Sequence, residues 1–470
     1  MSRTQPPAVS PRVTSGTALL WLAAWIRRQA WLRVIYRLFP TSIRDKANVL
    51  MSAQARRRFP RTPAWDRPIP DAVGAPLPSP AAAPVSTSGG VNILGYIRGQ
   101  FGLAESARMY ARALIGDGVP VSLYDIDLGL PHGWDDRSLD SYISTALPHD
   151  VSIIFVNPDY LDRALDLVGR ERLQGRYLIA CWFWELEQIP ASWIPAIAQV
   201  DEIMVASGFV EDAFRRIADR PILRVPLPLS PVADSGLQRA DFGLDEGAFI
   251  FLCTFDFNSW IARKNPFAVI TAFRQAFGPE RTDVRLLVKS SNGHRHPAGM
   301  HALLAAAGGD ARIIIRDEVI ARAHVNALQR CCDAYVSLHR AEGFGLGLAE
   351  CMAMGKPVIA TGWSGNLEFM TEDNACLVDY TLVPVAEGEY LDAEGASWAE
   401  ADIASTASAM RRLADCPAEA ARIGARGQAD VLARLSPTLA ATSIQNRLAA
   451  IRGSAASASK HASQSGFPCP

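Results

Sequence analysis

The sequence predicts an α/β protein with two doubly wound parallel-sheet domains in tandem, preceded by a basic helical extension. Three observations carry this prediction. The chain has 470 residues, 49% hydrophobic and 20% charged, which is too long for one ordinary core. From Val91 on, short β-branched runs alternate with helical patterns, as in βαβ units. Prolines and polar residues over 224–243 interrupt the alternation and divide it into two series.

The N-terminal extension, residues 1–60, is basic. Residues 1–70 carry 13 Lys or Arg against 2 Asp or Glu, although the whole chain has a net charge of -1. Because the basic character is local, we expect no nucleic-acid partner. The segment "WLAAWIRRQAWLRVIYRLF" predicts an amphipathic helix whose apolar run is shorter than the roughly 20 residues of a membrane span. Two interpretations stay open: the helix lies on an anionic membrane surface, or it packs on the protein.

The remaining segments follow from composition and pattern. Residues 61–90, rich in Pro, Ala and Ser, predict an extended linker. The runs "VNILGYI", "VPVSLYDI", "VSIIFVN", "RYLIACWFW" and "DEIMVAS" predict the strands of an N-terminal domain over 91–237. A C-terminal domain over 238–430 is expected from "FIFLCTF", "VRLLVKSS", "RIIIRDE", "AYVSLH" and "KPVIAT". A terminal helix over 431–452 should cross back, and 453–470 should be a disordered tail.

A glycine-rich turn over 339–350, "HRAEGFGLGLAE", is the strongest functional motif. Glu342 and Glu350 have seven residues between them, and the glycines stand between a predicted strand and a predicted helix. Ligands of open α/β sheets bind at that edge, and a helix N-terminus attracts phosphate or sugar oxygens. Two carboxylates around such a turn suggest a nucleotide sugar. A glutamate near a helix start is also a common partner of the helix dipole, so the motif alone leaves function open.

The longer stretch "LHRAEGFGLGLAECMAMGKPVIATGWSGNLEFM" resembles the donor-site motif of the retaining glycosyltransferase family 4. Those enzymes have the GT-B fold, two Rossmann-like domains facing across a cleft, and use nucleotide diphosphate sugars. The resemblance implies that Glu342 accepts hydroxyls of the donor sugar and that Glu350 holds the ribose. It also implies a turn whose backbone faces sugar and phosphate, formed by Gly343, Phe344 and Gly345.

The same resemblance gives roles to basic residues and glycines elsewhere. In "FNSWIARKNPFAVITAF", Arg263 and Lys264 would neutralise the leaving diphosphate. Lys289 matches a further family lysine near the donor, although a surface lysine is an equal alternative. The loop "GYIRGQFGLAESAR" would face the donor phosphates through Gly99 and Gly102, with charge added by Arg98 or Arg108.

Residues at two other strand ends suggest an acceptor site. "CWFWELEQIP" places Trp182, Trp184 and Glu185 at the end of a predicted strand, where tryptophans could stack on a sugar and the carboxylate could bind its hydroxyls. Core packing is the alternative for the tryptophans. Asn157 stands where many members of the family have a histidine, which leaves a catalytic helper in this domain in doubt.

Metal and cofactor chemistry are not expected. Asp125 and Asp127 imitate a metal-binding DxD motif, but no further ligands accompany them. The eight cysteines show no CxxC spacing and are expected to be reduced core residues. The only small molecule expected besides an acceptor is the nucleotide diphosphate sugar, as a co-substrate.

The expected function is transfer of a hexose, with retention of configuration, from the nucleotide sugar to a glycan or lipid-linked acceptor. The setting would be cell-surface polysaccharide biosynthesis, by a cytoplasmic enzyme peripheral to the inner face of the membrane. Two alternatives stay open: a catalytically silent nucleotide-sugar-binding scaffold, and a GT-B epimerase or phosphorylase. A scaffold would bind nucleotide sugars without turnover. An epimerase would convert a nucleotide sugar without an acceptor, and a phosphorylase would require free phosphate.

Overall fold

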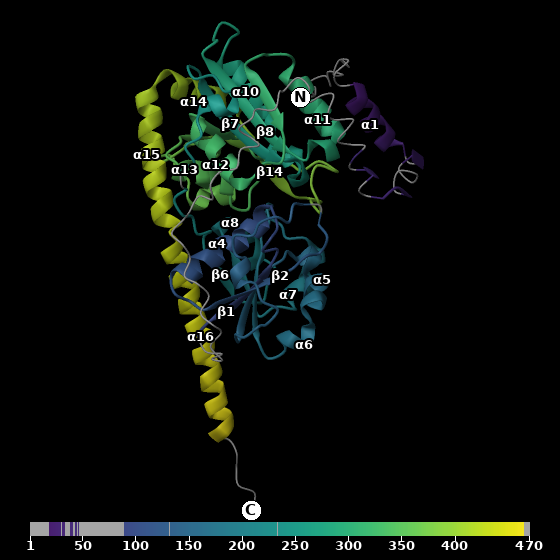
Figure 1. Cartoon of the computed structure of the whole chain (residues 1–470), viewed down its shortest axis with the longest axis vertical. Helices are drawn as coiled ribbons and strands as arrows, with labels where there is room; N and C mark the ends of the chain where they lie inside the picture. Colours follow the sequence, from purple (N-terminus) through teal and green to yellow (C-terminus); the bar gives the residue numbers. More distant parts are fainter. Residues whose placement is uncertain are drawn as a thin grey trace, which may run out of the picture.

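The computed structural model describes residues 18–29, 31–32, 38–40, 43–44, 46, 89–130, 132–232 and 234–464. Within them, two six-stranded sheets form two α/β domains that lie one above the other along the long axis (Figure 1). The predicted α/β architecture with two Rossmann-like domains is therefore confirmed. The expected linker over 61–90 lies outside the described residues except for its last two.

The sheet of the N-terminal domain is parallel throughout, in the order β2-β1-β3-β4-β5-β6. Every residue of its first and third strands is buried, as expected of parallel strands covered on both faces. Five strands were predicted; β6 was missed because it has three partly exposed residues followed closely by prolines. The strands are β1 (Val91–Gly95), β2 (Val121–Asp125), β3 (Val151–Phe155), β4 (Tyr177–Cys181), β5 (Glu202–Val205) and β6 (Ile222–Arg224).

The second sheet is also parallel, in the order β12-β11-β10-β7-β8-β9. Its strands are β7 (Phe249–Asp256), β8 (Val284–Ser291), β9 (Ile313–Asp317), β10 (Ala334–Ser337), β11 (Val358–Thr361) and β12 (Cys376–Val378). An antiparallel hairpin, β13 (Tyr380–Pro384) and β14 (Ser397–Ala401), follows β12. The sequence did not predict β12 or the hairpin, whose first strand is mostly exposed and lacks a buried face.

Helices connect the strands and begin at recognisable caps. The side chain of Ser207 accepts a hydrogen bond from the N–H of Val210 at the start of α8, and Asn265 does the same for Ala268 at α10. The N-terminal domain has α4 (Gly102–Gly116), α5 (Pro158–Val168), α6 (Arg170–Leu173), α7 (Ile194–Ile197) and α8 (Gly208–Arg215). The C-terminal domain has α9 (Ile261–Lys264), α10 (Pro266–Ala276), α11 (Pro297–Ala307), α12 (Arg322–Cys331), α13 (Leu346–Ala353), α14 (Ile403–Asp415) and α15 (Pro417–Arg434).

The last helix, α16 (Pro437–Gln464), returns from the C-terminal domain and packs along α4 of the N-terminal domain (Figure 1). Arg447 Nε lies 2.8 Å from an oxygen of Glu202, and the Leu229 N–H donates to the carbonyl of Leu435 at 2.7 Å where the helix begins its return.

The prediction of a disordered tail from residue 453 is wrong as far as Gln464, because α16 continues to that residue. Alanine-rich sequence extends an existing helix at little cost, because the nucleus is already formed. Residues 465–470 lie outside the described part.

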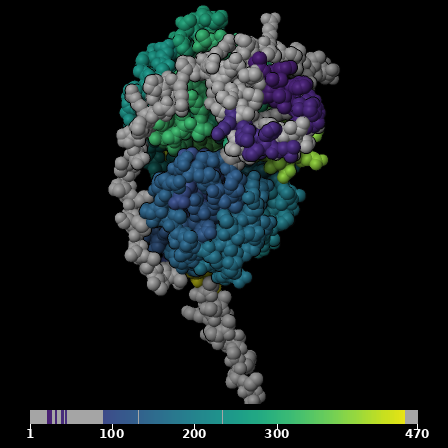
Figure 2. All heavy atoms as spheres, turned by 45° about the vertical axis from the view of Figure 1, so that its right-hand side comes forward, coloured from purple at the N-terminus to yellow at the C-terminus, as the bar shows by residue number. Residues whose placement is uncertain are grey.

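The N-terminal helix α1 (Ala18–Arg28) lies on the C-terminal domain, in contact with α11 (Figures 1 and 2). Ala23 is buried, whereas Trp21 and Trp25 are 46% and 45% exposed. The helix therefore packs on the protein and still presents tryptophans to solvent. Among the described helices, none has the length and apolar character required to cross a membrane.

Candidate active site

A buried charged cluster lies at the carboxyl ends of neighbouring strands β7 and β10. Arg263 and Lys264 end α9, which follows β7, and Glu342 lies in the turn after β10. Lys264 Nζ forms an ion pair with Glu342 Oε1, and Arg263 Nη1 lies 3.1 Å from Glu342 Oε2. The structure thus brings together the three residues predicted as catalytic, although Lys264 and Glu342 are 78 residues apart in sequence.

The cluster keeps Glu342 ionised. Glu342 is only 8% exposed, and burial by itself would raise the pKa of its carboxyl. Lys264 and Arg263 outweigh burial and lower the pKa of Glu342 to about 2. Arg263 also lies 3.4 Å from Glu185 of the N-terminal domain and donates to the carbonyl of Ala341 at 2.9 Å. Two cations therefore face two carboxylates at the junction of the domains.

The backbone of Glu342 is fixed by the turn that follows β11. The Ser364 hydroxyl accepts a hydrogen bond from the Glu342 N–H at 2.9 Å, and the Gly365 N–H donates to the Glu342 carbonyl at 2.8 Å. Ser364 has φ 82°, a conformation that costs a residue with a side chain about 1–3 kcal/mol. The strained turn positions the carboxylate before any ligand arrives.

The predicted glycine turn makes the contact between the domains. The carbonyl of Gly343 accepts a hydrogen bond from the Ser207 hydroxyl at 2.6 Å, and a Cβ at Gly343 would lie 2.7 Å from the Trp184 carbonyl oxygen. Phe344 is buried, and Gly345 has φ 92° before α13. These contacts show why glycines stand here. That the turn also presents backbone to sugar and phosphate stays a prediction.

A cavity of about 1040 Å³ separates the N-terminal loops from the strand ends of the C-terminal domain. Gly102 and Lys289, predicted on opposite sides of a donor site, both line it. Lys289 is buried, which lowers its pKa, and it makes no ion pair within the described part of the chain. Gly99 lies behind this wall, where its carbonyl accepts a hydrogen bond from Arg108 at 2.6 Å. A buried lysine facing a cavity is suited to binding an anion.

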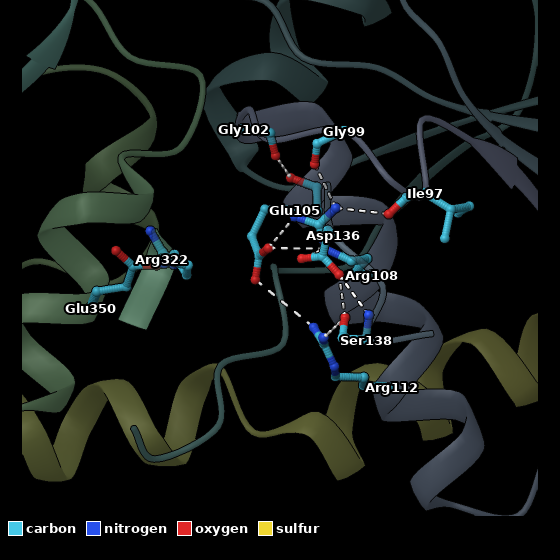
Figure 3. A network of polar contacts seen from close by, with 11 residues as sticks. Ile97, Gly99, Gly102, Glu105, Arg108, Arg112, Asp136, Ser138, Arg322 and Glu350 are labelled. Carbon is cyan, nitrogen blue, oxygen red and sulfur yellow. Dashed lines mark hydrogen bonds and ion pairs between the residues drawn. The ribbon is translucent and has the colours of Figure 1, made fainter. Parts of the chain in front are cut away.

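The two arginines expected to add charge to this wall are already paired. Arg98 Nε lies 2.9 Å from Asp140, and Arg108 lies 2.6 Å from Glu105 and 3.2 Å from Asp136 (Figure 3). Arg108 also donates to two main-chain carbonyls of its own loop. Both arginines therefore hold the loop in shape. Arg108 also lines the cavity, and that its charge acts on a ligand stays a prediction.

Glu350, the predicted ribose ligand, has a partner that the sequence analysis missed. The Arg322 side chain forms an ion pair with it from the start of α12 (Figure 3) and lines the cavity. Gln329 Nε2 lies 3.4 Å from its other oxygen. A cation in the first turn of a helix opposes the helix dipole, and Arg322 could have been noticed on that ground.

The predicted acceptor residues divide into two groups. Trp184 is 4% exposed and donates its indole N–H to the Gln188 carbonyl at 2.8 Å, and Trp182 is fully buried. The Asn157 amide bonds the main chain of Phe183 at 3.2 and 3.3 Å. A sugar-stacking face on Trp184 is therefore a wrong expectation, because the ring is buried. The side chain of Asn157 is already bonded to the main chain, and its role toward an acceptor stays a prediction.

Glu185, in contrast, reaches the charged cluster. Its side chain is 23% exposed, pairs with Arg263, and accepts a hydrogen bond from the Tyr390 hydroxyl. Tyr390 lies in the loop between β13 and β14, so it was missed together with the hairpin.

No cluster of three or more metal-ligating side chains occurs among the described residues. Asp125 accepts from the Arg98 N–H at 3.1 Å, and Asp127 accepts from the Gly129 N–H at 2.8 Å. Both carboxylates therefore shape loops.

Comparison with known proteins defines the class to which this fold and site correspond. The structure is similar to that of Anabaena HepE in complex with UDP and glucose, with a TM-score of 0.57 and 15% identity over 77% of this chain and 100% of that one. The structure is also similar to that of sucrose-phosphate synthase from Thermosynechococcus elongatus. The TM-score is 0.56 and the sequence identity 18%, over 78% of this chain and 100% of that one. These likenesses show the GT-B fold.

The sequence comparisons are more specific for the C-terminal domain. Residues 249–391 match the family model described as "Glycosyl transferases group 1", a range that contains Arg263, Lys264, Lys289, Glu342 and Glu350. Trehalose synthase from Rubrobacter xylanophilus is 28% identical over 225 residues, 45% of this chain and 48% of that protein. The match thus spans about half of the curated relative. Together, the domain match and the fold support a GT-B glycosyltransferase.

Proposed function

We propose that the protein is a retaining glycosyltransferase of the family 4 type. It transfers a hexose from a nucleotide diphosphate sugar to a glycan or lipid-linked acceptor, in cell-surface polysaccharide biosynthesis. The observation that carries the proposal is the buried cluster of Glu342, Arg263 and Lys264 at the junction of the two domains. The group 1 glycosyl transferase match over the same residues supports it, as does the UDP in the complex of the similar HepE.

The residues divide the work by charge. Lys264 and Arg263 stabilise the charge that develops on the leaving diphosphate, and Lys289 adds a cation on the side of the cavity. Glu342 orients the sugar by accepting hydrogen bonds from its hydroxyls. Since no protein nucleophile is assigned, the leaving diphosphate accepts the proton of the attacking hydroxyl on the face it leaves. The protein contributes orientation and preorganised charge.

The test is incubation of the purified protein with UDP, GDP and ADP sugars, with and without acceptors. We expect nucleoside diphosphate to be released from one of the donors, and the release to be faster when an acceptor is present. NMR of the product should show the same anomeric configuration as in the donor. Binding without release would favour the silent scaffold. Conversion without an acceptor, or only with free phosphate, would favour an epimerase or a phosphorylase. Because two similar proteins are named for trehalose and sucrose phosphate, the acceptors include free sugars and sugar phosphates.

We also propose that the extension over 1–60 holds the enzyme at an anionic membrane on its cytoplasmic face. Trp21, Trp25 and Trp31 are exposed, in a segment whose charge is strongly positive. Each basic residue near an anionic surface contributes about 1 kcal/mol, so binding should be reversible and salt-sensitive. Deletion of residues 1–60 should therefore abolish sedimentation with phosphatidylserine vesicles at low salt and leave nucleoside diphosphate binding unchanged.

The deletion also uncovers the face of α11 that α1 contacts. A triple replacement of Trp21, Trp25 and Trp31 by serine, which retains the rest of α1, is the matched variant and should weaken sedimentation without loss of fold. Phosphatidylcholine vesicles are the control for charge. If the full-length protein does not sediment with phosphatidylserine vesicles at low salt, the proposal is contradicted and the helix has a purely structural role.

A further inference from the structure

Trp260 is an exposed aromatic residue in a strained conformation beside the charged cluster. It follows the 3₁₀ helix η5 (Phe257–Ser259) and immediately precedes α9, which carries Arg263 and Lys264. Its side chain is 39% exposed, and its φ is 62°. A bulky residue pays about 1–3 kcal/mol for such a conformation, and strained residues of this kind gather at functional sites. Glycine would adopt it freely, so backbone geometry alone does not explain a tryptophan here.

Tyr390 forms the neighbouring wall and is held by both domains. Its ring centroid lies 5.8 Å from that of Trp260 and 5.6 Å from that of Trp184. The hairpin that carries it reaches the N-terminal domain, where Ser192 lies 3.2 Å from Asp392. Two aromatic rings therefore stand together at the seam, one partly open to solvent and one fixed in the packing.

Glu185 links these rings to the donor cluster. One of its oxygens accepts from the Tyr390 hydroxyl, and the other lies 3.4 Å from Arg263, which in turn pairs with Glu342. A sugar ring has an apolar face of C–H groups and a rim of hydroxyls, so it fits an exposed indole beside a partly exposed carboxylate. The carboxylate of Glu185 beside the rings disfavours an anionic ligand and suits a neutral sugar.

We propose that Trp260, Tyr390 and Glu185 form the acceptor subsite, and that its ligand is a sugar ring, free or at the end of a glycan. The ring stacks on Trp260, and a hydroxyl bonds Glu185. This proposal rests on the proposed transfer reaction and names the chemistry of its acceptor. It replaces the platform expected at Trp184 with an aromatic residue from the opposite domain.

The experiment compares Trp260→Gly and Trp260→Phe with wild type and with Tyr380→Ala. Glycine removes the ring and accepts φ 62°, so the variant should fold, and phenylalanine keeps a stacking face. Tyr380 is the control, because it is equally exposed at 39% on the same hairpin but its ring lies against Trp363. Three quantities are measured for each protein: UDP binding, hydrolysis of the donor without acceptor, and transfer to methyl glucoside, methyl galactoside and methyl mannoside.

We expect Trp260→Gly to raise the acceptor KM about tenfold or more. UDP binding and donor hydrolysis should stay within about twofold of wild type, and Trp260→Phe should recover most of the KM. An unchanged acceptor KM overturns the proposal. So does a parallel fall in nucleoside diphosphate binding and donor hydrolysis, which would indicate a structural role. Failure of every methyl glycoside to stimulate release of nucleoside diphosphate by wild type, measured with the donor found in the screen, overturns it as well. Absence of donor binding and hydrolysis in wild type would instead refute the transfer reaction itself.

Discussion

Replacing Glu342 with glutamine should reduce transfer roughly 30-fold to 1,000-fold while UDP binding stays equal or becomes tighter. The amide keeps the shape of the side chain but accepts hydrogen bonds from sugar hydroxyls less strongly than a carboxylate. It also no longer neutralises Lys264 and Arg263, which are then free to pair with the diphosphate. Initial rates and calorimetry with UDP measure the two effects separately. Wild-type turnover by the variant would refute the donor-site assignment.

The same substitution should destabilise the fold in a pH-dependent way. Removing one member of a buried ion pair typically costs about 3–5 kcal/mol, and here Glu185 offsets part of the loss for Arg263. Because the folded-state pKa of Glu342 is lowered from 4.5 to about 2, its contribution is complete above 4.5 and is lost as the pH falls through about 2. Denaturant unfolding of wild type and Glu342→Gln should therefore differ by a constant amount at neutral pH and converge in acid. Glu394→Gln, at an exposed position, is the control.

Replacing Lys264 with methionine should weaken UDP binding about 10-fold to 100-fold and leave uridine binding unchanged. The proposed partner of Lys264 is the diphosphate, so loss of the ammonium group should not change the affinity for the nucleoside. Methionine retains the length of the stem and limits the packing defect. Glu342 keeps Arg263 as a counter-ion at 3.1 Å, so the protein should fold.

Lys356→Met is the matched control, since Lys356 is a half-buried lysine that follows α13 and belongs to no part of the cluster. Equal small effects of Lys264→Met on UDP and uridine would contradict its role. Arg263 is a less clean probe. It bonds two carboxylates and a carbonyl, and its removal should unsettle the junction between the domains as well as the ligand site.

Local pattern was sufficient for ten of the twelve strands of the two sheets and for singling out Glu342, whereas Arg263 and Lys264 were assigned through the family resemblance. Buried parallel strands such as β3 are continuous apolar runs, and Glu342, Arg263 and Lys264 stand at the ends of such strands, where topology brings them together. A residue's place relative to a strand end can be read from sequence, because the strand itself is short and periodic.

The contacts that could not be predicted are those between side chains of elements that lie far apart in the sequence. Trp184 and Trp260 both follow strands and both lie against Tyr390, yet Trp184 is buried because it also packs on Trp193, whereas Trp260 is 39% exposed. The pairing of Arg322 with Glu350 likewise joins α12 to α13 through folding in three dimensions. No periodicity in the sequence records either contact.

The return of α16 brings the two connections between the domains side by side. The chain passes between the domains twice, once after β6 and once between α15 and α16, and the Leu229 to Leu435 hydrogen bond ties the two passages together. Away from these two passages, noncovalent contacts alone hold the described parts of the domains against each other. The contacts across the seam include Ser207 to Gly343, Glu185 to Arg263 and Tyr390, Ser192 to Asp392, and Gly208 to Glu368. Separation of the domains would therefore take Glu185 away from Arg263 but leave Glu342, Arg263 and Lys264 together, because all three belong to the C-terminal domain.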